Sequence, residues 1–155
     1  GYGMSGDAYH MTSPHPDGKG AKLAMKMALK KAEMNPEKVD YVNAHGTSTP
    51  MGDVLEFNAV KEVFSNNLDN LCMSSTKSAT GHLLGGAGAI EAVFSIKTIN
   101  DGIVPPTLNL YNQDEKCTGI DLVPFKAKEK NIKAALSNSF GFGGTNACLI
   151  FKKFE

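Results

Sequence analysis

The sequence predicts an α/β domain in which a mixed β-sheet is layered against helices. Strand-like and helix-like segments alternate over residues 20–100, and the chain closes with two strand-like segments joined by a glycine-rich turn. With 155 residues, of which 41% are hydrophobic and 21% charged, the chain is long enough to bury one sizeable core. We therefore expect residues 1–155 to form a single domain.

The first predicted helix follows a loop over residues 10–20, which is rich in residues that favour turns. Over residues 21–34, apolar side chains and lysines recur at helical spacing, giving one apolar face and one basic face. Pro36 cannot continue that helix. Residues 39–43 then predict a short buried strand, which leads into a polar loop over residues 45–50. Loops at the carboxyl ends of such strands are where α/β folds place ligands.

The middle of the chain predicts two more helices around another strand. Asp53 is the expected N-cap of an amphipathic helix that runs through Phe64. Residues 71–75 predict a strand, followed by a polar loop over residues 77–82. Residues 83–99 carry small and apolar side chains all round, which predicts a central helix that is buried on most of its faces.

The last third of the chain predicts a closing hairpin. Residues 105–106 are a Pro-Pro pair that begins an extended stretch, and residues 109–118 form a polar loop. Residues 134–139 and 147–151 are strand-like, and the turn between them, over residues 141–144, contains three glycines. We expect these two strands to complete the mixed sheet.

The composition excludes several classes of function. The 16 basic and 16 acidic residues balance, so no general field draws the chain to nucleic acid or to an anionic membrane. No apolar stretch reaches the roughly 18 residues that predict a membrane-spanning helix. Cys72, Cys117 and Cys148 are an odd number without a CxxC pair, which argues against a zinc site or a disulfide framework and favours a reducing compartment.

Two histidines are the first candidates for catalysis. His45 and His82 each lie in a loop after a predicted strand, flanked by glycine and hydroxyl residues rather than by apolar residues. A neutral imidazole can donate a hydrogen bond, and two such donors that converge on a thioester oxygen would stabilise an enolate. A metal site would need further ligands, which no motif supplies. A structural role for each histidine is the competing interpretation.

Lys77 and Glu91 are a candidate ion pair. Lys77 is the one charged residue of its loop, and Glu91 is the one acid on the mostly apolar helix that follows. If the two pair in a buried position, both charges are satisfied and their field acts on the protonation of His82. The alternative is a solvated loop lysine and a surface acid.

Two further groups of residues can bind a ligand. Thr47 and Thr49 alternate in an extended loop, so both hydroxyls can face one side and bind an amide-bearing arm, with simple turn capping as the alternative. The glycines of residues 141–144 leave backbone N–H groups unshielded, as an oxyanion hole requires. Phe140 and Phe142 can wall an apolar chain there, and a plain hairpin turn is the alternative.

Three long segments resemble the β-ketoacyl-acyl-carrier-protein synthases, most closely the type II condensing enzymes. These segments are residues 42–50 (VNAHGTSTP), 74–82 (SSTKSATGH) and 138–146 (NSFGFGGTN), in the order found in the family. Residues 4–14 and 104–107 also resemble the family, so the match spans the whole chain. The resemblance implies the C-terminal half of a thiolase-like fold.

The resemblance implies a decarboxylative Claisen condensation in fatty acid elongation. An acyl chain is loaded onto a cysteine, malonyl-carrier protein loses carbon dioxide, and the resulting enolate attacks the acyl thioester. No metal or organic cofactor is implied, since the substrate is carried on the phosphopantetheine of acyl carrier protein. On this pattern His45 and His82 are the catalytic histidines, and Lys77 with Glu91 supports their arrangement.

The resemblance also assigns the binding residues. Thr47 and Thr49 are expected to contact the phosphopantetheine arm. Phe142 resembles a gatekeeping phenylalanine whose backbone N–H helps to form the oxyanion hole for the acyl group. The same loop contributes Phe140, Gly143 and Asn146 as expected substrate-binding residues.

One departure from the family concerns the nucleophile. The family's catalytic cysteine lies in the other half of the fold, at a helix N-terminus that stabilises its thiolate, and no cysteine here has that setting. We therefore expect residues 1–155 to be the C-terminal domain of a longer homodimeric enzyme, inactive without its N-terminal half. Its other expected partner is acyl carrier protein, with no nucleic acid and no membrane partner. The cytoplasm is the expected location, with a plastid or mitochondrion as the alternative.

Two alternative functions stay open at this point. One is a non-catalytic, chain-length-determining subunit of a polyketide synthase pair, although both histidines and Lys77 argue against it. The other is the ketosynthase domain of a modular polyketide enzyme.

Overall fold

The computed structural model describes residues 1–154 and confirms the α/β class. Over these residues a five-stranded mixed sheet has the order β1-β7-β6-β2-β3. Strand β2 is parallel to β3 and β6, whereas β7 is antiparallel to β6 and to β1. A small second sheet pairs β4 with β5. The strands are β1 (Tyr2–Gly6), β2 (Tyr41–Asn43), β3 (Cys72–Ser74), β4 (Ile103–Val104), β5 (Lys128–Glu129), β6 (Ala134–Gly141) and β7 (Thr145–Lys152).

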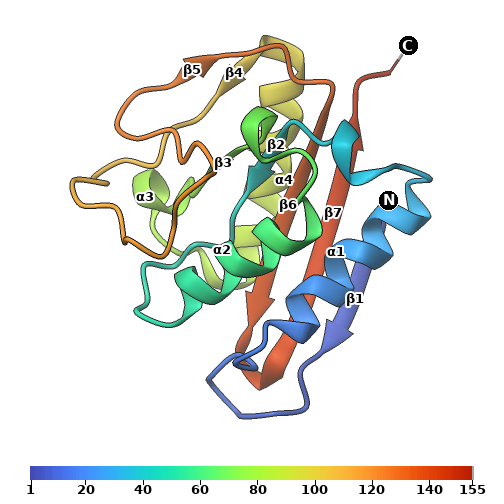
Figure 1. The fold of residues 1–155 in the computed structure, drawn as a ribbon, viewed down its shortest axis with the longest axis vertical. Helices are drawn as coiled ribbons and strands as arrows, with labels where there is room; N and C mark the ends of the chain where they lie inside the picture. Colours follow the sequence, from blue (N-terminus) through green and yellow to red (C-terminus); the bar gives the residue numbers. More distant parts are fainter. Residues whose placement is uncertain (155) are drawn as a thin grey trace.

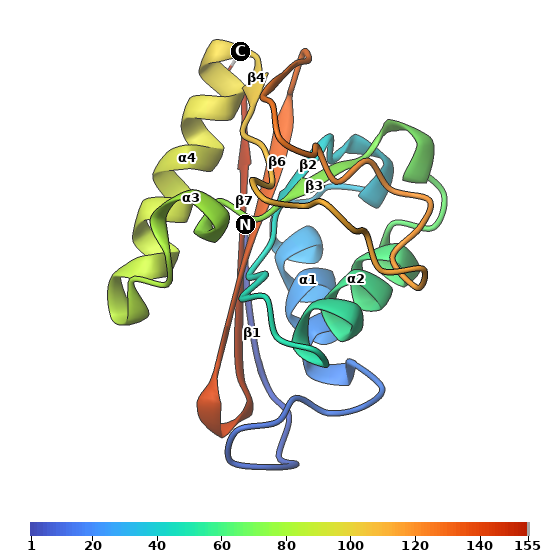
Figure 2. The same cartoon turned by 90° about the vertical axis from the view of Figure 1, so that its left-hand side faces the viewer.

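The helices lie on both faces of the main sheet. Helices α1 and α2 cover one face and α4 covers the other, as Figure 1 and Figure 2 show. The helices are α1 (Lys19–Lys31), α2 (Gly52–Val63), α3 (Lys77–Thr80) and α4 (Ala87–Asp101), with short 3-10 turns at Pro36–Lys38, Leu68–Asn70, Leu84–Gly86 and Phe142–Gly144. None of the helices within residues 1–154 is long and apolar enough to cross a membrane.

The main core lies between the sheet and helices α1 and α2. Met25 of α1, Phe57 of α2 and Leu136 of β6 are buried in it. Burial of such apolar side chains, each worth about 1.5–3 kcal/mol, holds the helices on the sheet.

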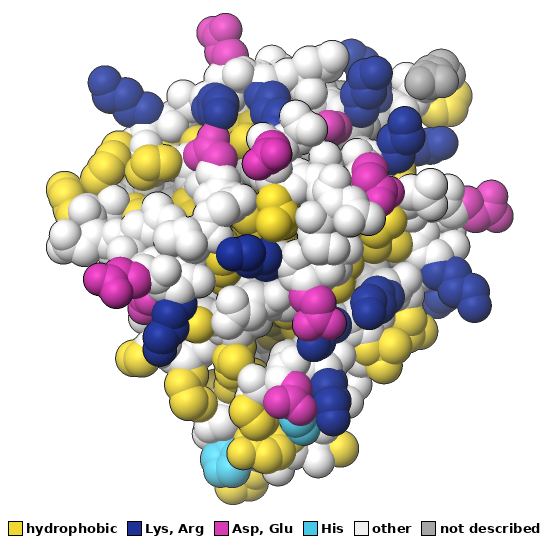
Figure 3. Space-filling view, in the orientation of Figure 1, with side chains coloured by type: hydrophobic (Ala, Val, Ile, Leu, Met, Phe, Trp, Pro, Cys, Tyr) yellow, Lys and Arg dark blue, Asp and Glu magenta, His cyan; other side chains and the backbone are white. Residues whose placement is uncertain are grey.

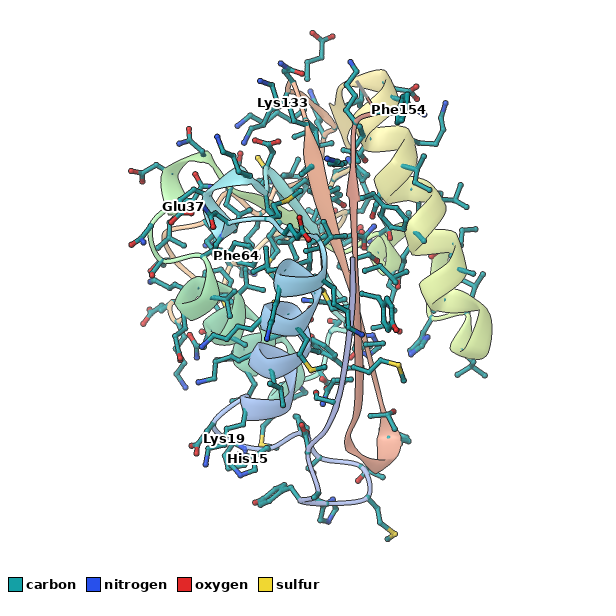
Figure 4. The ribbon with its side chains drawn as sticks, turned by 90° about the vertical axis from the view of Figure 1, so that its right-hand side faces the viewer. His15, Lys19, Glu37, Phe64, Lys133 and Phe154 are labelled. Atoms are coloured by element: carbon teal, nitrogen blue, oxygen red, sulfur yellow. The ribbon has the colours of Figure 1, made fainter. Side chains whose placement is uncertain are left out.

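Most charged side chains of residues 1–154 lie at the surface, whereas Glu56, Lys77 and Glu91 are buried. Phe64 lies inside the core layer in Figure 4, whereas Lys19 and Lys133 lie at the surface. On the face shown in Figure 3, basic and acidic side chains are interspersed, with hydrophobic side chains between them. That face therefore has no extended area of a single charge sign, in agreement with the balanced composition.

The edge strand β1 depends on a glycine. A Cβ atom at Gly3 would lie 1.9 Å from the carbonyl oxygen of Ala24, so no larger residue permits this approach of β1 to α1. Because Gly3 faces α1, the alternating residue Met4 faces the other side of the sheet, where it is exposed. Tyr2 is also exposed, and the Lys31 ammonium of α1 lies 3.6 Å from its ring centroid. The sequence did not predict this strand.

The expectation of a helix buried on most of its faces is wrong for the described residues. Helix α4 buries one stripe, which includes Glu91, Ser95 and Ile99, against the sheet. On its other side Val93 is 55% exposed and Ile96 is 41% exposed. An apolar helix is buried only where a second layer covers it, and residues 1–154 supply a layer on one side alone.

Two boundaries also differ from the expectations. Helix α2 begins at Gly52, so Asp53 lies in its first turn and does not serve as the N-cap. The polar loop expected at residues 77–82 contains the one-turn helix α3. Both differences occur where side chains and backbone of the candidate site are tied together by hydrogen bonds.

Candidate active site

The two histidines come together at the carboxyl ends of neighbouring parallel strands. His45 follows β2, and His82 follows α3, which is reached from β3. Their ring centroids are 5.4 Å apart with an interplanar angle of 83°, an edge-to-face arrangement. Phe140, on β6, lies against His45 with a centroid distance of 5.7 Å. Three adjacent strands of the sheet therefore contribute to one site.

Both imidazoles are placed where a ring N–H can donate a hydrogen bond. The Nδ1 atom of His82 accepts a hydrogen bond of 3.0 Å from the Leu84 N–H, so in the neutral ring the proton is on Nε2. His45 is half-buried, and its burial lowers its pKa to about 4, with the positive charge of Lys77 and the nearby His82 acting in the same direction. At neutral pH His45 therefore carries no charge.

Lys77 and Glu91 form the expected buried ion pair. The Lys77 ammonium donates to Oε1 of Glu91, and both residues are buried. Burial raises the pKa of the Glu91 carboxyl, whereas the Lys77 ammonium and His82 oppose that rise. The second oxygen, Oε2, has no hydrogen-bond partner within residues 1–154. The pair is thus a fixed charged element beside the histidines, and the alternative of a solvated lysine is wrong.

A buried carboxylate that the sequence did not single out holds the loop of His45. Glu56 accepts hydrogen bonds of 2.9 Å from the backbone N–H groups of both His45 and Gly46, and one of 3.1 Å from the Asn138 side chain. Burial raises the pKa of Glu56, and these three donors oppose that rise. Glu56 lies on the same helical stripe as the buried Val60, and an acid in that position was the available signal.

Gly46 allows the loop to turn behind His45. Its φ of +37° is in the region that favours glycine, and a Cβ there would lie 2.7 Å from the Cβ of Ser75. The Ser75 hydroxyl donates a bond of 2.6 Å to the Gly46 carbonyl. The loop after β2 is thereby tied to the loop after β3, which fixes the two histidines relative to each other.

A second segment clamps the loop that carries Lys77. The Ser75 N–H donates to Oγ1 of Thr107 at 3.2 Å, and the Leu108 N–H donates to Oγ of Ser78 at 2.8 Å. These contacts lie on both sides of Lys77 in the sequence. The extended stretch after the two prolines therefore helps to hold the Lys77 ammonium in position.

The two threonines of the first loop face the same side. Their Oγ1 atoms are 3.4 Å apart, and Thr49 is exposed whereas Thr47 is half-buried. The backbone of this loop is held by Asp53, whose carboxylate accepts from the N–H groups of Ser48 and Thr49 at 3.1 and 3.3 Å. Both hydroxyls are thus accessible on one face, and their contact with a pantetheine arm stays a prediction.

The glycine-rich turn is held by other segments in ways the sequence did not indicate. Phe142 lies exposed at the tip of the β6–β7 hairpin. The Gly143 N–H donates to the Met11 carbonyl at 2.6 Å, so the expectation of an unshielded N–H there is wrong in this conformation. Asn146 is buried, and its amide donates to Asp7 at 2.8 Å and to the Gly144 carbonyl at 3.2 Å. Asn146 here orders the turn and does not face open space.

The three cysteines do not have the setting of a nucleophile. Cys72 is in β3, Cys148 is in β7 and Cys117 is in a loop, and all three are buried. Burial raises the pKa of each thiol. A reactive thiolate needs the opposite shift, so none of these residues is equipped to carry an acyl group.

The arrangement can stabilise a developing oxyanion. Imidazoles from two loops lie edge to face beside a fixed Lys–Glu pair, and backbone contacts from Glu56 and Thr107 preorganise those loops. Donors that are held in place before the reaction stabilise charge without the cost of reorganisation. Such a site suits chemistry that passes through an enolate.

Comparison with known proteins identifies related chains. Residues 1–111 match the family described as β-ketoacyl synthase, C-terminal domain. The chain is 56% identical over 154 residues to 3-oxoacyl-[acyl-carrier-protein] synthase 2 of Rhizobium meliloti, and 54% identical over 153 residues to that of Coxiella burnetii. These alignments cover 99% of this chain and only 36% and 37% of the relatives. The chain thus spans little more than a third of their length.

Solved structures of similar proteins have the same fold. A complex of a type II polyketide acyl-carrier protein with its ketosynthase contains a chain that superposes with a TM-score of 0.95 at 37% identity, over 100% of this chain and 38% of that one. A β-ketoacyl synthase from Burkholderia phymatum gives a TM-score of 0.88 at 37% identity, over 100% of this chain and 37% of that one. The similarity therefore extends over every part of the chain.

Proposed function

The chain belongs to the family of β-ketoacyl synthase C-terminal domains, and on this basis we propose that it supplies the malonyl-side groups of a decarboxylative Claisen condensation in fatty acid elongation. The observation that carries the proposal is the pair of imidazoles, edge to face at 5.4 Å, beside the buried Lys77–Glu91 pair. The names of the relatives, 3-oxoacyl-[acyl-carrier-protein] synthase 2, support the same reaction.

In the proposed reaction His45 and His82 bind the thioester oxygen of malonyl-carrier protein. The carbon–carboxylate bond breaks, carbon dioxide leaves, and the electron pair of that bond moves into an enolate whose oxygen the two imidazoles stabilise. The enolate carbon then attacks an acyl thioester held on a cysteine of the longer protein, and the cysteine thiolate leaves. No step requires a metal or an organic cofactor, because the phosphopantetheine arm only carries the substrate.

Lys77 supports this role by its charge. An ammonium next to His45 opposes protonation of the imidazole, and a neutral imidazole with a free N–H can donate to an enolate that forms beside it. Glu91 accepts a hydrogen bond from the ammonium and so holds it in place. Thr47 and Thr49 are the proposed contacts of the pantetheine arm, and Phe142 the proposed gate toward the acyl chain.

The proposed partners follow from surfaces that the chain leaves open. Helix α4 lies on the face of the sheet opposite α1 and α2 (Figure 2), and its exposed apolar side supports a second layer supplied by the N-terminal half of the same enzyme. A related ketosynthase has been solved in complex with an acyl-carrier protein, which supports acyl carrier protein as the other partner. A homodimeric enzyme in the cytoplasm, or in a plastid or mitochondrion, completes the proposal.

The test uses the full-length protein that contains this chain. We expect His45→Ala and His82→Ala to reduce decarboxylation of malonyl-carrier protein by about 10²-fold or more, the size of effect seen when one oxyanion donor is lost. Acyl transfer to the cysteine nucleophile, followed by intact mass, should persist in both variants. Normal decarboxylation in either variant would refute its proposed role.

The same assays separate the alternatives. A chain-length-determining subunit would show neither acylation nor decarboxylation in the wild type. A modular polyketide ketosynthase would show both acylation and decarboxylation. It would, however, prefer an acyl chain with a β-keto or β-hydroxy group over a fully reduced acyl chain.

A further inference from the structure

A cluster of reactive side chains lies away from the site described above, at the start of β3. Lys130 places its Nζ 3.4 Å from the Sγ of Cys72 and also donates to the carbonyl of Asn70. The Cys72 thiol points to Oδ2 of Asp121 at 3.8 Å, and the same carboxylate oxygen accepts from Lys128 at 2.6 Å. A thiol is thus enclosed by an amine and a carboxylate, both fixed by further contacts.

The backbone keeps these groups together. Cys72 and Asp121 form an isolated parallel β-bridge, and the Met73 N–H donates to the Asp121 carbonyl at 2.9 Å. Lys130 follows β5, and its own N–H donates to the Gly102 carbonyl at 2.9 Å. The contact between sulfur and nitrogen therefore joins residues that are 58 positions apart in the sequence but rigidly placed in space.

We propose that Cys72 and Lys130 form a covalent sulfur–nitrogen cross-link when the protein is exposed to a peroxide. An amine within contact distance of a thiol can trap the sulfenic acid that a peroxide generates, as thiols and backbone nitrogens are known to do. The inference does not depend on the function proposed above.

The chemistry balances with a single equivalent of oxidant. Hydrogen peroxide oxidises the Cys72 thiol to the sulfenic acid and is itself reduced to one molecule of water. The Lys130 ammonium first loses one proton to the solvent. The resulting neutral amine attacks the sulfur, the S–N bond forms, and the sulfenic hydroxyl leaves with an amine proton as a second molecule of water. Counted from the neutral thiol and the neutral amine, the two residues together lose two hydrogen atoms.

Burial limits which reagents can modify this thiol. Cys72 is only 1% exposed, so we expect bulky alkylating reagents to react with it far more slowly than hydrogen peroxide, which is a much smaller molecule. Burial raises the pKa of the thiol, with the Asp121 carboxylate acting in the same direction and the Lys130 ammonium opposing the rise, so we expect oxidation to be slow. The thiol of Cys148, the other buried cysteine in a strand, has the Leu149 carbonyl as its only hydrogen-bond partner among residues 1–154.

A cross-link here would act on the strand that leads to Lys77. Cys72 begins β3, and the loop that carries Lys77 follows the end of this strand. A covalent tie from Lys130 would restrain β3 against the segment that precedes β6. Oxidation would therefore restrict the movement of β3 relative to the segment that precedes β6.

The test treats the full-length protein with hydrogen peroxide and maps its peptides without reduction by mass spectrometry. We expect a joined pair of peptides containing Cys72 and Lys130, about 2 Da lighter than their sum, that separates on treatment with dithiothreitol. The joined pair should be absent in Cys72→Ser and in Lys130→Arg, which keeps the positive charge. It should persist in Lys128→Arg, the matched control, because Lys128 contacts Asp121 and not the sulfur.

Several outcomes would overturn the proposal. One is the detection of Cys72 peptides with one, two or three added oxygen atoms while no joined pair of peptides is found. Others are a link from Lys128 instead of Lys130, or no change at Cys72 under conditions that oxidise the other thiols. If the variants fold poorly, the lysines of the wild-type protein can instead be reductively dimethylated before peroxide is added. A tertiary amine cannot form the neutral sulfur–nitrogen link, so the joined peptides should be absent. Joined peptides that still form after dimethylation would refute the role of Lys130.

Discussion

Replacing Lys77 with methionine removes one charge of the buried ion pair while keeping most of the side-chain volume. The Lys77 and Glu91 side chains are 4% and 2% exposed, so the Glu91 carboxylate would be left without its partner where water has little access. Breaking a buried pair by removing one partner costs about 3–5 kcal/mol of folding free energy. We expect a loss of that size for Lys77→Met.

The same substitution should change the protonation of His45. The Lys77 charge is one of the causes that lower the pKa of His45 from 6.5 to about 4. Without it, the pKa of His45 rises toward its ordinary value, and the neutral fraction at mildly acidic pH falls. The acid limb of the decarboxylation rate should therefore move to higher pH in Lys77→Met.

The assays are denaturant unfolding of the full-length protein and the pH dependence of malonyl decarboxylation. Lys97→Met is the matched control, because Lys97 pairs with Asp101 at 2.9 Å on the surface of α4, with side chains that are 62% and 42% exposed. An exposed pair of this kind contributes about 0.3–0.5 kcal/mol. The double variant Lys77→Met with Glu91→Leu removes both charges and should recover much of the lost stability but not the pH profile.

Two results would contradict this prediction. A loss of stability in Lys77→Met no larger than in Lys97→Met would mean that water reaches the buried pair. An unchanged acid limb in Lys77→Met would mean that the ammonium does not control His45.

Further substitutions test the loops around the site. The pKa of His45 is lower in the folded protein than in the unfolded chain, so the free energy of unfolding should rise as the pH increases from 4 to 6.5. In His45→Asn this rise should be smaller by roughly 1–2 kcal/mol. Denaturant unfolding at several pH values measures the difference. Glu56→Leu leaves the N–H groups of His45 and Gly46 without an acceptor, at about 1–3 kcal/mol each, and should lower both the melting temperature and the condensation rate. Gly46→Ala places a methyl group against Ser75 at a positive φ, which should lower the free energy of unfolding by about 1–3 kcal/mol and should also lower kcat. Denaturant unfolding measures the first effect and steady-state kinetics the second. Thr107→Val removes the acceptor of the Ser75 N–H and should lower kcat more than it raises KM, with Thr107→Ser restoring the rate.

The control for Glu56→Leu is Glu62→Leu, which removes an exposed acid of the same helix that pairs with Lys22. An equal effect of the two would contradict the role given to Glu56. An unchanged dependence of stability on pH in His45→Asn would contradict the lowered pKa of His45. Wild-type stability of Gly46→Ala would contradict the close approach of Gly46 to Ser75. A Thr107→Ser variant as slow as Thr107→Val would contradict the role of the Thr107 hydroxyl.

Hydrophobic periodicity was enough to predict most elements of the fold. The apolar and basic faces of residues 21–34 gave α1, and the closing strands gave β6 and β7. Strand β1 was missed because its glycines weaken the strand pattern, and Gly3 is there for a contact with α1 that lies 21 positions away. The burial of α4 was overestimated because apolar composition does not say whether a second layer is present.

The candidate site was predictable only where a residue's type itself limits its role. His45, His82 and Lys77 stood out as titratable groups in polar loops after strands, and the resemblance of their segments to a family pointed to the same residues. Glu56 was not recognised, because a helical acid followed by apolar residues has the same local pattern whether it is solvated or buried.

Periodicity and side-chain chemistry are local properties, so the amino-acid order alone was sufficient for the α/β class and for the residue types that carry the chemistry. Three features required the folded chain: the two imidazoles meet edge to face, Lys77 and Glu91 are buried together, and the Gly143 N–H is already bonded to Met11. Folding also brought Lys130 against Cys72. These contacts join residues far apart in the chain, and their geometry depends on how the layers pack.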